Sequence, residues 1–274
     1  MRRRSQLNIS LLGLSTSQEL SEDRQFAMNL ARGIEVLRAF TAAAPLLGNR
    51  EISDRTGLPK ATVSRLTYTL TTIGLLSHDI ELQKYRLGVG LLSLSHPLMA
   101  SLHVRQIAHP LMERLARETG CTINLGMRER GNVVYVDTVR VDKGNTQHPD
   151  IGSSRPLLAT AIGRALILGS EGAESTAILN YLKVRDYALF EEHSDAWEAD
   201  RRRFAAQGYC RADGSWKKDL YAVALPLRLQ TREPLFAMNC TLAASRMPEA
   251  RLERDVLPQL REAVREIKDA YGLA

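Results

Sequence analysis

The segment Gly57-Leu58-Pro59 separates two short stretches of helical periodicity near the start of the chain. Gly57 stands where the end of a helix favours a left-handed residue, and Pro59 stands where the first turn of a new helix favours proline. We therefore expect one helix that begins with Asn49 as its N-cap and a second that runs from Pro59 to about residue 73. Two short helices joined by a tight glycine turn are typical of the helix-turn-helix motif.

The segments on either side of this motif extend it. A longer helix is predicted over residues 24–43 and ended by Pro45, because apolar residues recur on one face at Leu30, Ile34 and Leu37. After the motif, residues 75–78 and 84–87 have the pattern of two short strands joined by a polar turn. A hairpin in this position is the wing of a winged helix-turn-helix.

The charge distribution indicates an anionic partner. The chain of 274 residues has a formal net charge of +6, and no acidic residue lies between Asp54 and Asp79. A surface that contacts phosphates needs such a local absence of repulsion. We expect the helix after Pro59 to enter the major groove of double-stranded DNA and the wing to meet the backbone, through Arg50, Lys60, Ala61, Thr62, Ser64, Arg65, Tyr68, Lys84 and Arg86. The alternative is a helical hairpin whose charges are merely solvated.

Beyond the wing the apolar pattern changes from helical to alternating. Helices are predicted over residues 89–100 and 104–119, and then strand pairs over 122–128 with 133–140 and 222–229 with 235–242. Further helices are predicted over 160–168, 195–207 and 252–267. Strand pairs flanked by helices indicate an α+β domain with a largely antiparallel sheet. The predicted divisions are a flexible basic arm (1–24), a winged helix-turn-helix domain (25–88), a linker helix (89–103) and the sheet domain (104–274).

Several classes of protein lack support in the sequence. No apolar run approaches the roughly 18 residues of a membrane-spanning helix. The three cysteines, Cys121, Cys210 and Cys240, are too few and too scattered for a disulfide framework or a metal site, which favours a reducing cytoplasm. The histidines lack metal-binding spacing, and no P-loop, GxSxG or Rossmann glycine series is present. We expect no catalytic residues, no metal and no cofactor.

Two blocks of sequence resemble a known family. Residues 57–66, Gly-Leu-Pro-Lys-Ala-Thr-Val-Ser-Arg-Leu, followed by Tyr-Arg-Leu-Gly at 85–88, resemble the DNA-binding domain of IclR-type transcriptional regulators. Residues 156–165, Pro-Leu-Leu-Ala-Thr-Ala-Ile-Gly-Arg-Ala, are similar to the effector-domain segment written His-Ala-Thr-Ala-x-Gly-Lys-Ala. The resemblance runs from about residue 31 to 271. It implies a winged helix-turn-helix, a linker helix used in dimerisation, and a GAF-like domain that binds a small effector.

The resemblance also assigns a pocket. Its lining in this sequence would be Leu157, Ala161, Ile162, Asp213, Ala222, Asn239 and Thr241. The family's histidine is replaced by Leu158 and its lysine by Arg164, and residues 211–216 lack the paired acids common in the family, so the identity of the effector is open. The alternation in 236–241 puts Asn239 and Thr241 on one side of a strand, as donors to a carboxylate would require. The alternative is a pair of polar residues that face solvent.

The sequence thus predicts a cytoplasmic, ligand-responsive transcriptional regulator that is not an enzyme. A homodimer would bind a pseudo-palindromic operator and sense a small organic acid, aliphatic or aromatic, such as a catabolic intermediate; pairing of dimers into tetramers is left open. One rival is a small-molecule-binding or enzymatic C-terminal domain attached to a non-specific DNA-binding module. Another is a purely architectural DNA-binding protein. Turnover and a titrating catalytic group would identify the enzyme. Sequence discrimination, rather than bare affinity for DNA, separates the regulator from the architectural protein.

Overall fold

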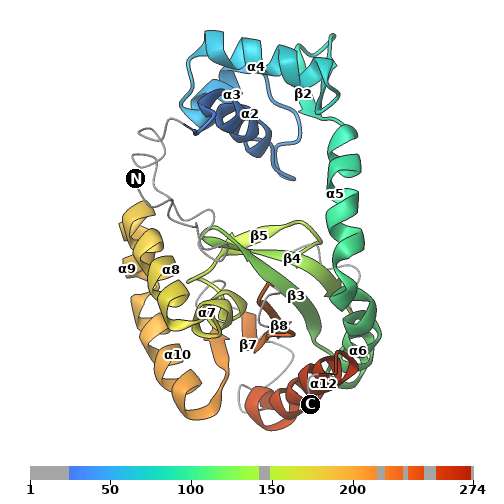
Figure 1. Cartoon of the computed structure of the whole chain (residues 1–274), viewed down its shortest axis with the longest axis vertical. Coiled ribbons are helices and arrows are strands. Elements are labelled where there is room, and N and C mark those ends of the chain that lie inside the picture. The colour runs from blue at the N-terminus through green and yellow to red at the C-terminus, as the bar shows by residue number, and fades with distance from the viewer. Residues whose placement is uncertain (1–24, 142–148, 215–219, 231–233, 244–250, 273–274) are drawn as a thin grey trace, which may run out of the picture. The chain divides into compact units, whose positions relative to one another are not determined.

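The computed structural model describes residues 25–141, 149–214, 220–230, 234–243 and 251–272. It divides the chain into two compact units, with the boundary between Leu102 and His103 (Figure 1). The basic arm predicted over residues 1–24 lies outside the described residues. Each unit is described by itself below.

The N-terminal unit is a winged helix-turn-helix, as the sequence predicts. Its elements are α2 (Met28–Arg38), α3 (Asn49–Thr56), α4 (Lys60–Thr72), β1 (Leu76–Asp79) and β2 (Lys84–Leu87). The strands β1 and β2 form an antiparallel hairpin. Tyr85 of β2 also exchanges backbone hydrogen bonds with Leu47, just before α3, so the wing is joined to the helical part.

The turn between α3 and α4 has the predicted geometry, but the N-cap of α3 differs from the prediction. Gly57 has a φ of +70°, in the left-handed region. The N-cap of α3 is Gly48, whose N–H donates to the carboxylate of Glu51 at 2.7 Å. Asn49 is the first helical residue, and its Oδ1 accepts a hydrogen bond from the Thr67 hydroxyl at 3.2 Å. The Asn49 side chain therefore holds α3 to α4 and does not cap α3.

The first helix is shorter than predicted and buries a different face. It ends at Arg38 rather than near residue 43, because residues 41–44 form a tight turn closed by two backbone hydrogen bonds. Leu30 and Ile34, two of the three residues of the predicted apolar face, are 69% and 39% exposed. The helix and its end contribute Val36, Ala39 and Phe40 to the core, and partly buried Leu37 packs against them. The helix has apolar residues on two faces, and the periodicity alone does not say which face the core covers.

The helix α5 (Gly90–Ser101) follows the wing at the position of the predicted linker helix. None of its residues is buried within the chain, although its sequence, Gly-Leu-Leu-Ser-Leu-Ser-His-Pro-Leu-Met-Ala-Ser, contains no Lys, Arg, Asp or Glu. Leu92, Leu94 and Leu98 are 73%, 65% and 57% exposed. An apolar helix left uncovered in one chain is typical of an interaction surface.

The C-terminal unit is built on one antiparallel sheet with the strand order β5-β4-β3-β8-β7-β6. The strands are β3 (Thr122–Glu129), β4 (Asn132–Val139), β5 (Ser154–Pro156), β6 (Cys210–Asp213), β7 (Leu220–Leu227) and β8 (Phe236–Ala243). The two predicted strand pairs are β3 with β4 and β7 with β8, and β3 pairs with β8 at the centre. The α+β prediction is confirmed, and the short edge strands β5 and β6 are additions.

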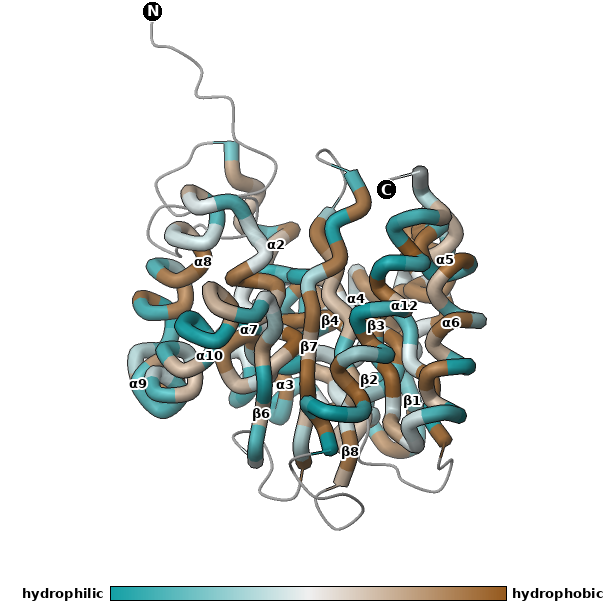
Figure 2. The backbone as a smooth tube through the Cα atoms, turned by 90° about the horizontal axis from the view of Figure 1, so that it is seen from below, coloured by the Kyte–Doolittle hydropathy of each residue, from teal (hydrophilic) through white to brown (hydrophobic). Residues whose placement is uncertain are grey.

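Helices cover both faces of this sheet (Figures 1 and 2). One face carries α6 (His103–Thr119) and α12 (Leu257–Ala270), and a π-helical turn at Leu252–Val256 precedes α12. The other side carries α7 (Ala161–Leu168), α8 (Gly172–Arg185), α9 (Tyr187–Glu192) and α10 (Ser194–Gln207). We call the side of the sheet that α7 covers the α7 face. Its core includes Ile162 of α7 together with Ala222, Ala224 and Ala237 of the central strands.

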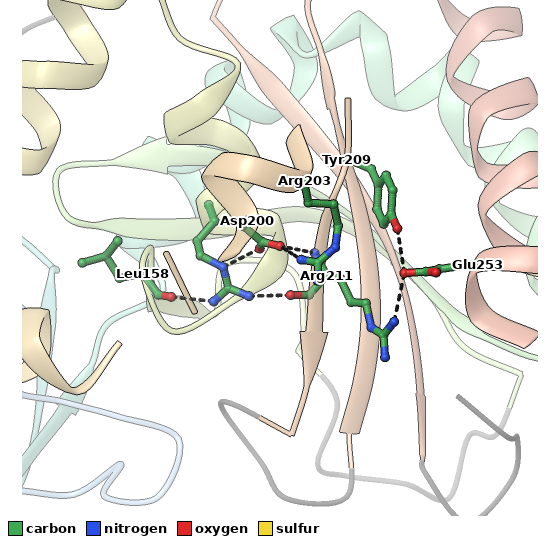
Figure 3. A network of polar contacts seen from close by, with 7 residues as sticks. Leu158, Asp200, Arg203, Tyr209, Arg211 and Glu253 are labelled. Atoms are coloured by element: carbon green, nitrogen blue, oxygen red, sulfur yellow. Dashed lines mark hydrogen bonds and ion pairs between the residues drawn. The ribbon is translucent and has the colours of Figure 1, made fainter. Parts of the chain in front are cut away.

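A buried ion pair holds α7 to its surroundings (Figure 3). Arg164 of α7 and Asp200 of α10 are both fully buried, and Arg164 Nε donates to Asp200 Oδ2 at 2.6 Å. The remaining guanidinium nitrogens donate to the backbone oxygens of Leu158 at 2.7 Å and Arg211 at 2.8 Å. Asp200 Oδ1 accepts the Arg211 backbone N–H at 2.9 Å and a hydrogen bond from Arg203. The positive charge retained at position 164 is thus used within the fold.

Removal of one partner of this pair should destabilise the C-terminal unit strongly. In Asp200→Ala the Arg164 guanidinium would stay buried without its counter-charge, and such losses cost about 3–5 kcal/mol of unfolding free energy. Urea unfolding followed by tryptophan fluorescence measures this, since Trp197 and Trp216 both lie in the C-terminal sequence. The matched control is Glu198→Ala, which removes a carboxylate of the same helix paired with Arg201 at the surface and should cost less than about 1 kcal/mol. Equal stability of Asp200→Ala and the control would contradict this assignment.

Candidate nucleic-acid interface and effector site

One side of α4 is left free for contacts outside the domain. Val63, Thr67 and Leu70 of this helix are buried in the domain core. The residues predicted to contact DNA lie on the opposite side, where Lys60, Ala61, Ser64, Arg65 and Tyr68 are exposed and Thr62 is half-buried. The structure therefore brings the predicted α4 set together on one accessible surface, with Tyr68 74% exposed.

The cations of α4 and those of the wing differ in their surroundings. Neither Lys60 nor Arg65 forms an ion pair with a described residue. In the wing, Lys84 lies 3.2 Å from Glu51 and Arg86 lies 2.7 Å from Asp79. The cations of α4 are thus available for phosphates or base edges, whereas those of the wing already compensate carboxylates of their own domain.

The carboxylates beside the wing are stabilised in their charged form. The Gly48 N–H and then Lys84 lower the pKa of Glu51. The Leu82 N–H and then Arg86 lower the pKa of Asp79. Arg50 is exposed and lies 4.0 Å from Asp54. The three predicted DNA contacts outside α4, Arg50, Lys84 and Arg86, therefore each lie beside a carboxylate of their own domain.

The position of α4 is fixed by hydrogen bonds around the turn. The Ser53 hydroxyl donates to the Leu58 backbone oxygen at 2.6 Å, across the turn itself. Arg55 donates to the backbone oxygen of Ala39, beyond the end of α2, at 2.8 Å. With the Thr67 to Asn49 bond between the helices, these contacts hold the helix that carries Lys60 and Arg65 in a defined orientation.

In the C-terminal unit the predicted effector residues of the 156–165 block surround the start of α7. Leu157, Ala161 and Ile162 are all buried. Thr160 caps the helix by accepting the Gly163 N–H at 3.1 Å. A side chain at Gly163 would meet the Leu157 backbone oxygen at 2.2 Å, so only glycine lets α7 lie so close to the preceding loop. The block therefore forms a tight, largely apolar corner.

The predicted residues on the strands share the α7 face. Thr241 is opposite Ala222, and Asn239 is opposite Ala224, in the pairing of β8 with β7. Asn239 and Thr241 are 3% and 5% exposed, so they lie on one side of the strand as predicted and do not face solvent. Their nearest polar neighbours come from β3: Asn124 donates to Asn239 at 2.9 Å, and Thr241 donates to the Thr122 backbone oxygen at 3.2 Å.

Asp213 is not brought together with the others. It is exposed at the end of β6 and alternates with buried Ala212, which lies on the α7 face opposite Ala222. The side chain of Asp213 is therefore directed to the face of the sheet opposite the α7 face. Its predicted role in the pocket has no support from its position.

The thiols of Cys121, Cys210 and Cys240 are buried, and burial raises the pKa of each. Among the described residues no cluster of three potential metal ligands is present. Across the same residues, no helix is both long and apolar enough to span a membrane.

Comparison with known proteins identifies the family. Residues 29–79 match the model of the IclR helix-turn-helix domain, and residues 96–269 match that of the bacterial transcriptional regulator IclR C-terminal domain. The chain belongs to the IclR family of DNA-binding transcriptional regulators. The winged helix-turn-helix and the GAF-like sheet domain are thus the two parts of an IclR protein.

Individual relatives agree with this assignment. The HTH-type transcriptional regulator TsaQ1/TsaQ2 of Comamonas testosteroni is 29% identical over 88% of this chain and 87% of its own. The crystal structure of an IclR family regulator from Brucella abortus is 37% identical, with a TM-score of 0.83 over 95% of this chain and 98% of that one. An IclR homologue from Microbacterium hydrocarbonoxydans, complexed with 4-hydroxybenzoate, shares the fold at 20% identity, with a TM-score of 0.68 over 90% of this chain and 100% of that one.

Proposed function

We propose that this IclR-family protein acts as a homodimer that binds a pseudo-palindromic operator and responds to a small organic acid. The observation that carries the proposal is the basic surface of α4, where Lys60 and Arg65 form no ion pair with a described residue, in a chain whose neighbouring helix α5 is apolar and uncovered. The basic surface of α4 would recognise one half-site of the operator, and the apolar helix α5 would pair two such domains. Since its target is DNA, the protein would act in the cytoplasm.

The base-reading role goes to α4 and the supporting role to the wing. Arg65 can form a bidentate contact with guanine, and Lys60 can contact a base or a phosphate. Thr62, Ser64 and Tyr68 would add hydrogen bonds and packing from the same side. Lys84 and Arg86 would contribute less, because each must leave a carboxylate in order to reach a phosphate.

Dimerisation through α5 explains its composition. The helix has no Lys, Arg, Asp or Glu, and three of its leucines are more than half exposed, which is unfavourable in water. In the proposed dimer a second copy covers these leucines by two-fold symmetry. The exposed face of α2, with Leu30 and Ile34, is a further apolar surface in the same unit. Two recognition helices related by a two-fold axis read two inverted half-sites.

The effector would bind on the α7 face. Leu157, Ala161 and Ile162 would supply an apolar wall, and Asn239 and Thr241 would supply polar groups. This combination suits a small acid with an apolar or aromatic body. The crystal structure of the Microbacterium homologue is a complex with 4-hydroxybenzoate, and this supports an acid of the same kind for this chain. The acid can alter operator occupancy only if it binds one dimer geometry more tightly than another.

Loss of Arg65 should weaken specific DNA binding. Arg65→Ala is expected to cost about 1–3 kcal/mol and to relax one base position, because a bidentate contact is lost. Fluorescence anisotropy at fixed salt, on a site recovered from random DNA, measures the affinity. Arg202→Ala removes the same charge from the exposed surface of α10 and is the control. An Arg65→Ala protein that binds as tightly as this control removes Arg65 from base recognition.

Charges placed on α5 should separate the dimer. In the double variant Leu92→Glu, Leu98→Glu the apolar surface would carry four carboxylates per dimer, so sedimentation velocity should detect monomers. Val184→Glu changes an equally exposed apolar residue of α8 and should leave the dimer intact. The same measurement on the wild type distinguishes a dimer from a tetramer. A double variant that sediments like the wild type would show that α5 is not the interface.

Effector binding can be tested by calorimetry. A panel of small carboxylic acids that includes 4-hydroxybenzoate is titrated into the full-length protein, and the tightest acid is tested on Asn239→Ala and Thr241→Val. Asn239→Ala should bind it about tenfold more weakly or worse, as expected for a lost hydrogen bond to a charged group. Thr241→Val should weaken binding less, because the Thr241 hydroxyl must leave the Thr122 backbone oxygen before it can donate to the acid. Thr176→Val is the control, because Thr176 is exposed and its hydroxyl donates to the Gly172 backbone oxygen within α8. Unchanged affinity in both site variants would show that the acid binds elsewhere.

A further inference from the structure

A row of polar side chains crosses the centre of the α7 face. Thr138 of β4, Asn124 of β3 and Asn239 of β8 are direct partners in the strand register, and they lie side by side on three adjacent strands. Asn124 is fully buried, and Asn239 is 3% exposed. The row continues on β7 with Ala224, which has no polar side-chain atom. Polar groups in such a place are costly unless each finds a hydrogen-bond partner.

The hydrogen bonds along this row run in one direction. The Thr138 hydroxyl donates to Asn124 Oδ1 at 3.1 Å. The amide nitrogen of Asn124 then donates to Asn239 Oδ1 at 2.9 Å. With its oxygen occupied from one side, Asn124 has a single orientation that satisfies both neighbours.

The last amide in the row remains incomplete. Asn239 uses its oxygen to accept from Asn124, and its amide nitrogen, which carries two N–H donors, makes no hydrogen bond to any described residue. The strand partner on its other side, Ala224, supplies no side-chain acceptor. A buried amide that is satisfied on its acceptor side and open on its donor side matches a ligand atom that accepts hydrogen bonds.

We propose that Asn124 is a positioning residue for the effector. By donating to Asn239 Oδ1, it orients that amide so that the two N–H groups point to the ligand, and Thr138 in turn orients Asn124. This inference rests on the proposed function of the α7 face as the effector site. It deepens that function by stating why the site selects a carboxylate: an anionic oxygen accepts from Asn239, whereas a group that offers N–H would meet another donor.

The test compares a carboxylic acid with its own primary amide, because the two have nearly the same shape and differ in hydrogen-bond polarity. The probes are 4-hydroxybenzoate and 4-hydroxybenzamide, or the corresponding pair for a tighter acid of the panel, titrated by calorimetry into the full-length protein. The wild type should bind the acid more tightly than the amide. The ratio of the two affinities is the readout, because a general loosening of the domain would weaken both ligands alike.

Two variants act on the row without touching the proposed ligand contact. In Asn124→Leu the Asn239 amide is no longer held, and the affinity for the acid should fall about tenfold to hundredfold, with the acid-to-amide ratio falling toward one. Thr138→Val keeps both amides but frees Asn124 to turn, and should reduce the same ratio a few-fold. It also serves if Asn124→Leu does not fold, as judged by thermal unfolding. Thr176→Val on α8 is again the matched control and should leave the ratio unchanged.

The outcomes separate the two levels of the proposal. If the wild type prefers the acid and the variants reduce that preference, the positioning role is supported. If the wild type prefers the acid and the variants keep the same ratio, the positioning role is wrong and the effector site stands. If the wild type binds no acid of the panel, or binds acid and amide equally, both the carboxylate effector and the role of Asn124 are overturned.

Discussion

The buried ion pair between Arg164 and Asp200 is the contact around which the C-terminal unit is assembled. A guanidinium without solvent is stable only when its donors are occupied, and here three elements supply the acceptors: the loop before α7, the helix α10 and the strand β6. The loop is the one that carries Leu157, part of the proposed effector wall. The apolar corner around Leu157 is therefore held in place by a fully buried ion pair.

The same network extends toward the other face of the sheet. The backbone N–H of Arg211 donates to Asp200, and its side chain donates to Glu253 at 2.9 Å, near the start of α12; Tyr209 donates to the same carboxylate at 2.6 Å (Figure 3). These bonds lower the pKa of Glu253, with Tyr209 the largest cause, and so keep its charge. Elements on both faces of the sheet are thus tied to one edge strand, β6.

Local signals in the sequence were enough to predict the motifs, but they were not enough to predict the long-range contacts between side chains. Gly57 and Pro59 specify the turn between α3 and α4 through backbone geometry alone, and the alternating strands specify the two hairpins, so these features could be predicted. The buried face of α2 could not, because the helix has apolar residues on two sides and only the tertiary core selects between them. Asp200 and Asn124 were missed for a related reason: they act through partners 36 and 115 residues away in sequence, which one sequence does not reveal. A weaker signal for Asn124 was present in the alternation of Thr122 and Asn124 along β3.

The measurement that most directly tests the protein as a dimeric, sequence-specific regulator is selection of binding sites from random DNA. Purified full-length protein at near-physiological salt should enrich an inverted repeat whose half-sites are about one helical turn, 10–10.5 base pairs, or a multiple of it apart. This result is expected because the cations of α4 form no ion pair with a described residue and because two copies are proposed to pair through α5. Binding without enrichment of any sequence would contradict it, and would reduce the winged helix-turn-helix to a non-specific anchor for the C-terminal domain.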